Sequence, residues 1–116
     1  MNYEEAFLWI CAATDPSKGK PIANNTRLYV NLDGSLTMKL HGNSIIKYTP
    51  THITLMDGGY KSITTKARLN AWSPKGLKIV QKDFVWWVEI GDEAWVMHNE
   101  FTVSYDMIKK LNEVKE

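Results

Sequence analysis

The sequence is short of cysteine, of long apolar runs and of net charge, and each shortage excludes a class of protein. Its single cysteine, Cys11, leaves no internal disulfide and no zinc finger built from cysteine pairs. The longest apolar runs, Ala6–Ala13 and Phe84–Val88, fall far short of the roughly 20 residues that a transmembrane helix needs. No contact with a membrane is therefore expected.

Disorder and targeting are also disfavoured. Five Trp, five Tyr and three Phe supply aromatic surface for a core, and no low-complexity tract interrupts the 116 residues. The first residues include Glu4 and Glu5 and no basic side chain, unlike a signal or transit peptide. At this length a single domain over residues 1–116 is expected, and the scarcity of cysteine favours a cytoplasmic protein.

The net charge of +1 conceals a strong segregation of charge along the chain. Residues 1–17 carry three acids and no base, residues 18–82 carry eleven bases and two acids, and residues 83–116 carry eight acids and three bases. The three segments therefore have charges of −3, +9 and −5. This asymmetry predicts a basic side that contacts a polyanion, unless the segments interleave in space.

Helix signals stand at both ends of the chain. Asn2 and Glu5 form a capping-box pattern before a helix with apolar residues at helical spacing, which Asp15-Pro16 should end. Ser104 is expected to cap a last amphipathic helix. The residues expected to dock that helix on the core are Met107, Leu111 and Val114.

Between these helices the apolar period is two, which is typical of strands. A loop over Ser17–Thr26 precedes a hairpin that turns at Asp33-Gly34. The further strands are expected at Ser44–Tyr48, His52–Met56, Tyr60–Ile63, Leu77–Gln81, Phe84–Ile90 and Ala94–His98, with a short helix over Lys66–Trp72 capped by Thr64-Thr65. The predicted fold is α+β: a mostly antiparallel β-meander of about six or seven strands with N-terminal, central and C-terminal helices.

No catalytic or metal-binding pattern is present. His41, His52 and His98 do not stand at metal-ligand spacing with one another or with a carboxylate, and Cys11 lies on the apolar helix face, where a buried and inert thiol is expected. Nucleotide-binding and hydrolase motifs are missing. We therefore expect no enzymatic activity, no metal and no cofactor.

Aromatic residues interleaved with bases favour nucleic acid, because stacking platforms and phosphate-binding cations are what single strands require. The segment from Tyr60 to Lys82 meets this demand. The residues predicted to bind are Lys61, Lys66, Arg68, Trp72, Lys75 and Lys78. The alternative is that the aromatic residues fill the core, which we expect for Trp86.

The strand Phe84–Ile90 is apolar on both faces, so it is either central or exposes one face to a partner. Trp87 and Trp95 are predicted outward on their strands and are the candidates for a protein interface. This pattern favours a second class of function. The chain would then be a protein-binding module that inhibits a host enzyme or defence factor, or a self-assembling subunit that forms a homo-oligomer.

Three segments follow one another in a recurrent order: His41-Gly42-Asn43-Ser44-Ile45, then Asp57-Gly58-Gly59-Tyr60, then Thr64-Thr65-Lys66-Ala67-Arg68-Leu69-Asn70-Ala71. With Gln81-Lys82-Asp83-Phe84-Val85-Trp86-Trp87 after them, they resemble a pattern of small uncharacterised proteins of tailed bacteriophages. The resemblance covers roughly residues 36–90. It implies a phage gene product in the bacterial cytoplasm and no particular activity.

Within the third segment, Arg68 and Asn70 are two positions apart, so they cannot both lie at the centre of one helical face. At least one of them should be available for a partner or for capping a neighbouring strand end. The leading prediction from the sequence is a non-enzymatic phage accessory protein that binds nucleic acid through its basic central segment.

Overall fold

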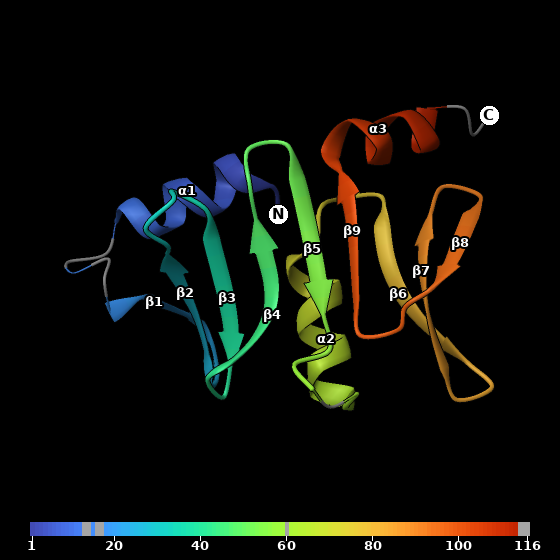
Figure 1. Cartoon of the computed structure of the whole chain (residues 1–116), viewed down its shortest axis with the longest axis horizontal. Helices are drawn as coiled ribbons and strands as arrows, with labels where there is room; N and C mark the ends of the chain where they lie inside the picture. The colour runs from blue at the N-terminus through green and yellow to red at the C-terminus, as the bar shows by residue number, and fades with distance from the viewer. Residues whose placement is uncertain (13–14, 16–17, 60, 114–116) are drawn as a thin grey trace.

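The computed structural model describes residues 1–12, 15, 18–59 and 61–113, which form three helices and nine strands (Figure 1). In chain order these are α1 (Tyr3–Cys11), β1 (Lys20–Ala23), β2 (Thr26–Val30), β3 (Leu36–Leu40), β4 (Asn43–Tyr48), β5 (His52–Met56), α2 (Ile63–Trp72), β6 (Leu77–Lys82), β7 (Val85–Ile90), β8 (Glu93–Val96), β9 (Glu100–Ser104) and α3 (Tyr105–Glu113). The α+β class, the antiparallel pairing and the positions of the three helices are confirmed.

The strands form two sheets. The larger has the order β1-β2-β3-β4-β5-β9, and the smaller has the order β6-β7-β8. All neighbouring strands are antiparallel, so β2 to β5 form a meander as expected, and β1 extends it at the edge. The chain then crosses to the smaller sheet and returns, and β9 pairs with β5 over Ile53 and Val103.

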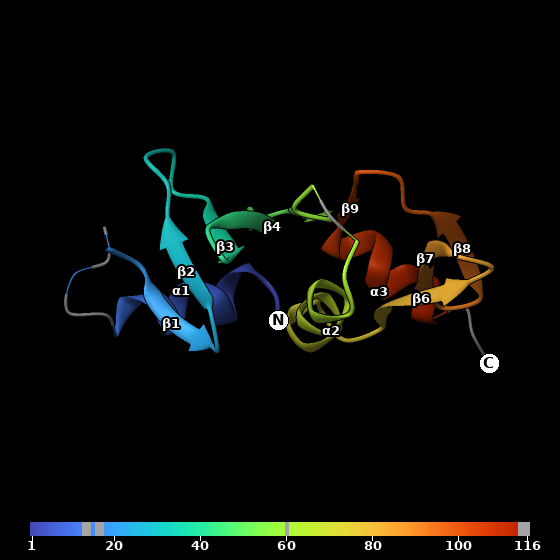
Figure 2. The ribbon, with the colours of Figure 1, turned by 90° about the horizontal axis from the view of Figure 1, so that it is seen from below.

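The core lies on one face of the six-stranded sheet. Leu28, Met38 and Ile46 occupy matching register positions on β2, β3 and β4, and all three are fully buried. Against them α1 packs Ala6 and Ile10, and Asn2 and Glu5 close the capping box that the sequence predicts. Figure 2 shows α1 and α2 on the same side of this sheet.

Helix α2 joins the two sheets. It contacts β4 of the larger sheet and β6 of the smaller one, and its buried residues are Thr65 and Leu69. The hydroxyl of buried Tyr48 donates a 2.6 Å hydrogen bond to the Trp72 carbonyl at the end of this helix. Tyr48 therefore ties the last turn of α2 to the larger sheet.

Several element boundaries differ from the sequence prediction. The N-cap of α2 is Ser62, whose Oγ accepts the Thr65 N–H at 3.0 Å, so the helix begins before the expected threonine cap. The strand expected at Tyr60–Ile63 is wrong, because Ile63 already belongs to α2, and Tyr60 lies outside the described residues. Part of the expected loop over residues 17–26 is instead strand β1, whereas Ser17 is outside the described part.

Some side chains also lie elsewhere than expected. Cys11 is exposed, so the expectation of a buried thiol is wrong; it stands at the last position of α1, beyond the buried Ile10. Met107 is exposed, and α3 docks through buried Ile108 together with Leu111, which packs against the core as expected. Phe84 lies in the turn before β7 and is 95% exposed. The expectations for Pro16 and Val114 fall outside the described residues.

Candidate nucleic-acid interface

Two of the six residues predicted to bind nucleic acid brace the flanks of α2. Lys66 Nζ donates to Gln81 Oε1 of β6 at 3.2 Å. Arg68 Nε donates to Thr26 Oγ1 at 3.0 Å, and Arg68 Nη2 donates to the Asn24 carbonyl at 3.3 Å. These contacts lie on opposite sides of the helix, so Lys66 ties α2 to the smaller sheet and Arg68 ties it to the larger one.

Lys61 is held by an ion pair. Its Nζ lies 2.9 Å from Asp57 Oδ2, donates to the His98 carbonyl and sits 5.9 Å from the centre of the Trp86 ring. Burial raises the pKa of Asp57, but the hydrogen bonds from Lys61 and from the Gly59 N–H outweigh it. The pKa of Asp57 is therefore held below its ordinary value. The ammonium fixes the loop before α2.

The other three predicted residues lie apart from one another. Lys78 pairs with Glu89 across β6 and β7 at 3.5 Å, in an exposed contact. Trp72 is half-buried and packs against the core. Lys75 is exposed in the loop between α2 and β6. The predicted residues thus flank one helix but do not form a single continuous surface.

A different set of basic residues gathers on the face of the larger sheet that points away from α1 and α2, which we call the open face. Successive residues of a strand point to opposite faces, so the buried Leu28 puts Arg27 and Tyr29 on the open face. The register then places Lys39 opposite Arg27, and Lys47 opposite Thr37. Figure 2 shows no helix on this side of β2–β4.

Two residues contact the Tyr29 ring on the open face. Lys39 Nζ lies 5.1 Å from the centre of its ring. The backbone of Gly19 is so close that a Cβ there would stand 2.8 Å from two ring carbons, and Gly19 has φ +73°. A residue other than glycine would therefore displace the ring. The contact with Lys39 is with a long, rotatable side chain, which can move without any change in the fold.

Arg27 completes a shallow pocket of about 300 Å³ on the open face. Its Nε and Nη2 donate to the carbonyls of Lys18 and Gly19 at 3.1–3.3 Å. Within the described residues, Nη1 makes no hydrogen bond and can still donate two. The pocket is lined by Pro21, Ala23, Asn25, Thr26, Arg27, Tyr29, Lys39 and Gly42.

The segments that carry the phage-protein resemblance converge beside this pocket. A second hollow of about 240 Å³ is lined by His41 and Asn43, by Asp57 and Gly58, and by Thr64 and Thr65. His41 adjoins Gly42 of the first pocket and has φ +51°. Three segments that are distant in sequence therefore meet at the end of the sheet where α2 begins.

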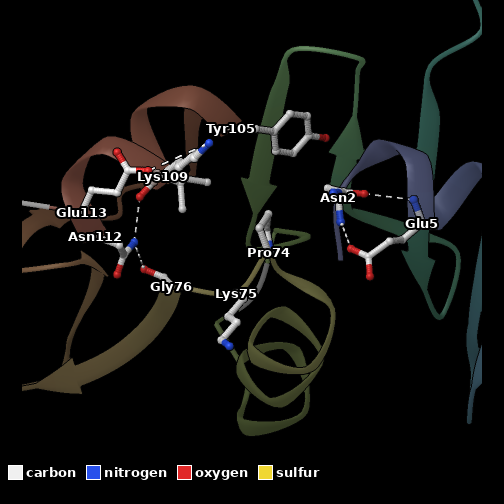
Figure 3. Close-up of a pocket in the computed structure, with 10 residues that line it drawn as sticks. Asn2, Glu5, Pro74, Lys75, Gly76, Tyr105, Lys109, Asn112 and Glu113 are labelled. Atoms are coloured by element: carbon white, nitrogen blue, oxygen red, sulfur yellow. Dashed lines mark hydrogen bonds and ion pairs between the residues drawn. The ribbon is translucent and has the colours of Figure 1, made fainter.

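A third pocket, of about 560 Å³, is at the opposite end of α2 (Figure 3). It lies between α3, the start of α1 and the loop before β6, and Asn112 Nδ2 bonds the Gly76 carbonyl at 3.1 Å beside it. Lys75 and Lys109 line it together with Glu5 and Glu113. Because both signs of charge are balanced there, a polyanion gains little from this pocket.

The histidines and Cys11 are the described side chains to consider for metal or catalytic chemistry, and they lie at the surface. His52 Nδ1 lies 2.8 Å from Thr51 Oγ1, and all three histidines are exposed. Within residues 1–12, 15, 18–59 and 61–113, no group of His, Cys, Asp and Glu could hold a metal ion. In the same part of the chain, no helix has the length and apolar character needed to cross a membrane.

The two tryptophans expected at a protein interface lie on opposite faces of the smaller sheet. Trp87 is half-buried and stands opposite Val96. Trp95 stands opposite Val88, is 38% exposed and packs on Phe101, with ring centres 5.7 Å apart. Trp86 is 3% exposed, so its place in the core is confirmed.

The sequence prediction does not include Arg27, Tyr29, Lys39 and Lys47 among the binding candidates, although the sequence pattern that places three of them on one face is present. Both strands of the predicted hairpin alternate, with Leu28 and Met38 inward and these residues outward. Reading the polar face of the alternation would have found three of the four. Lys47 required the register of the next strand.

Comparison with known proteins assigns the chain to a family. No curated protein and no solved structure matches it. The family model described as Kyanoviridae Gp96 protein matches residues 10–108. This range spans most of the 116 residues. It includes both sheets and the segments that line the 300 Å³ and 240 Å³ pockets. The protein therefore belongs to the Kyanoviridae Gp96 family of phage proteins.

Proposed function

We propose that this phage protein is a non-enzymatic accessory protein that binds single-stranded nucleic acid in the cytoplasm of the bacterial host. The contact is made by the basic segment of residues 18–82, through the open face of the six-stranded sheet. One observation carries the proposal: Arg27, Tyr29 and Lys39 stand side by side on a face that neither α1 nor α2 covers.

Tyr29 is the stacking platform in this proposal. Its ring is already held against Gly19, so a base that stacks on it orders little additional protein. The base replaces the Lys39 ammonium over the ring. An exposed cation–π contact contributes about 0.5–1 kcal/mol, whereas a base stacked on an aromatic side chain contributes about 1–3 kcal/mol. The exchange therefore favours the base.

The released Lys39 and the Nη1 of Arg27 then bind phosphate. Lys47 extends the basic surface to the next strand, because it lies one strand and two residues from Lys39 in the register. Their Cα atoms are consequently roughly 8 Å apart. The threonine pair Thr54 and Thr102, joined by a 2.8 Å hydrogen bond, continues the open face, and Glu100 adds one acidic side chain two residues further along β9.

Fluorescence anisotropy with a labelled single-stranded oligonucleotide of mixed sequence, titrated at several salt concentrations, tests the proposal. Affinity should fall as salt rises. The double variant Lys39→Gln/Lys47→Gln should lower the slope of log K against log salt by about 1.4, because each phosphate contact on a single strand contributes about 0.7. Tyr29→Ala should weaken binding about tenfold with little change in slope.

The matched control is Lys109→Gln/Lys110→Gln, which removes the same charge from exposed positions of α3. It should leave the affinity within about twofold. Absence of binding by the unsubstituted protein at low salt, or binding indifferent to salt, contradicts the proposal. If Lys66→Gln/Lys75→Gln/Lys78→Gln removes binding and the open-face variant does not, the contact lies along α2.

A second candidate is a protein-binding module that inhibits a host enzyme or defence factor. It is favoured by the smaller sheet, where all four residues of β8 are exposed and include Trp95 and Val96. A pull-down from host lysate treated with nuclease separates the two functions. The protein-binding module predicts a retained host protein that Trp87→Ala loses, and no effect of nuclease.

A further inference from the structure

Each sheet has two edge strands, which makes four in all. Another chain can add a strand at such an edge. In the larger sheet the end strands are β1 and β9, and in the smaller sheet they are β6 and β8. An edge strand has unpaired backbone groups along its outer side, and proteins that remain monomeric block these groups in recognisable ways. The four edges differ clearly in this respect.

Three of the edges are protected. Strand β1 contains Pro21, which has no N–H to donate, and its register slips between Pro21 and Ala23. The outer side of β6 is occupied by Asn70, whose amide bonds both the N–H and the carbonyl of Ile79. Strand β9 lies between β5 and the smaller sheet and contacts α3 (Figure 1).

Strand β8 has none of these protections. It lies at the end of the molecule farthest from β1, contains no proline and no lysine, and within the described residues pairs only with β7 (Figure 1). Its four residues are exposed, with Trp95 at 38% and Val96 at 36%. Phe84 and Val85 add exposed apolar surface at the neighbouring β6–β7 turn.

The turn between β7 and β8 determines which backbone groups are free. Gly91 and Asp92 are the two residues between the paired Ile90 and Glu93. In a two-residue hairpin the flanking pair is hydrogen-bonded, and hydrogen-bonded pairs then alternate along the ladder. Trp95 therefore bonds inward to Val88, whereas the N–H and carbonyl groups of Ala94 and Val96 point outward.

We infer that β8 pairs antiparallel with the β8 of a second copy of this chain, which makes one six-stranded sheet from two three-stranded ones. In this register Ala94 stands opposite Val96 of the second copy, and the reverse, so every outward group of the two residues is bonded. Trp95 then lies on the twofold axis and meets its counterpart.

The side chains of β8 suit a second copy of the same strand. The inner row Ile79, Val88 and Trp95 continues across the axis into the same three residues, so six apolar side chains form one row. Glu93 is the single charged residue of β8, and this register places it opposite Met97 rather than opposite another Glu93. The pairing thus adds apolar contacts and brings no like charges face to face.

Sedimentation velocity and light scattering on nuclease-treated protein, from low micromolar to several hundred micromolar, test the inference. The mass should rise with concentration from 13.3 kDa to twice that value. In parallel, NMR hydrogen exchange should show the amides of Ala94 and Val96 becoming protected as the concentration rises. Amides in β1 should not change.

Two variants make the test specific. Val96→Lys places an ammonium opposite Ala94 of the second copy, one residue from the axis. Ala94→Lys places one opposite Val96 of the second copy and pairs favourably with Glu89, its neighbour on β7. Each should shift the dimer midpoint at least tenfold to higher concentration with an unchanged melting temperature at low concentration. The matched control, Leu8→Lys on the exposed side of α1, should have no effect on the midpoint.

A chain that stays monomeric across the range, with exchanging Ala94 and Val96 amides, overturns the inference. So does a dimer that Leu8→Lys disrupts and the β8 variants do not, because the interface is then on α1. A mass increase that appears only with nucleic acid present has the same consequence. These outcomes do not depend on the open face, so they test β8 separately from the proposed function.

Discussion

Asn70 pairs both atoms of its side-chain amide with the backbone of Ile79. Nδ2 donates to the Ile79 carbonyl at 3.0 Å, and Oδ1 accepts the Ile79 N–H at 2.7 Å. One side chain of α2 thus takes the place of a neighbouring strand on the edge of β6. The same contact holds the smaller sheet to the helix that packs on the larger one.

Replacing this amide should destabilise the fold. Asn70→Ala removes two hydrogen bonds and leaves the Ile79 backbone groups without their partner, so we expect the free energy of unfolding to fall by about 2 kcal/mol. Urea unfolding monitored by tryptophan fluorescence measures the change. Asn43→Ala, at the exposed first position of β4, is the control and should change stability by less than about 0.5 kcal/mol. If Asn70→Ala and Asn43→Ala lower the free energy of unfolding equally, the hydrogen bonds of Asn70 do not stabilise the fold.

The role of Asn70 is only partly predictable from the sequence. Its separation from Arg68 by two positions indicates that the two side chains leave the helix in different directions, and the structure confirms this. That Asn70 meets the middle of β6 depends on how the chain returns after Pro74, which no local pattern determines. For the same reason the sequence does not indicate that Lys66 and Arg68 bond neighbouring elements, as they do in the structure.

Some strands are likewise predictable from the local sequence, and others are not. The β2–β3 hairpin is predictable because Asp33-Gly34 separates two alternating segments, and the observed register agrees. Strand β1 is not predicted because four residues give too little alternation and its proline indicates a loop; proline is tolerated in a strand only at an edge. Strand β9 escapes because its partner, β5, is far away in the sequence. Pairing between distant segments is a property of the tertiary fold.

Burial of Tyr48 should make the fold sensitive to alkali. Burial raises the pKa of this phenol above its usual value of 10.0, so the folded state resists losing the proton that the unfolded chain gives up. The stabilisation is complete below pH 10 and is lost as the pH rises above it. Above pH 10, the free energy of unfolding should therefore fall less steeply in Tyr48→Phe than in the unsubstituted protein, as measured by urea unfolding.

At pH 7, Tyr48→Phe should lower the free energy of unfolding by about 1 kcal/mol, because the hydrogen bond to the Trp72 carbonyl is lost. Tyr105→Phe is a companion variant, since burial also raises the pKa of Tyr105. It should lessen the alkaline fall separately. An alkaline slope that is identical in all three proteins contradicts the assignment to these phenols.

The ion pair between Asp57 and Lys61 predicts the opposite dependence at acid pH. The pKa of Asp57 is below its usual value of 3.8, so the carboxylate stabilises the fold above that pH and the contribution disappears as the pH falls further. Asp57→Asn should lower stability by about 1 kcal/mol at pH 7 and by nothing near pH 2. If the difference persists at pH 2, packing rather than charge explains the effect. Lys109→Gln, which removes a long and exposed ion pair, is the control.

Cys11 offers a chemical test of the end of α1. The sequence places it on the apolar side of the helix, but the helix ends at this residue and its side chain is exposed, so a thiol reagent reaches it without unfolding. We expect one equivalent of Ellman's reagent to react with the native protein about as fast as with the urea-unfolded chain, within roughly tenfold, because no opening step is required. Cys11→Ser should show no reaction. A native rate that is lower by many orders of magnitude, and that rises with urea, would mean that Cys11 is buried and that α1 continues to pack beyond Ile10.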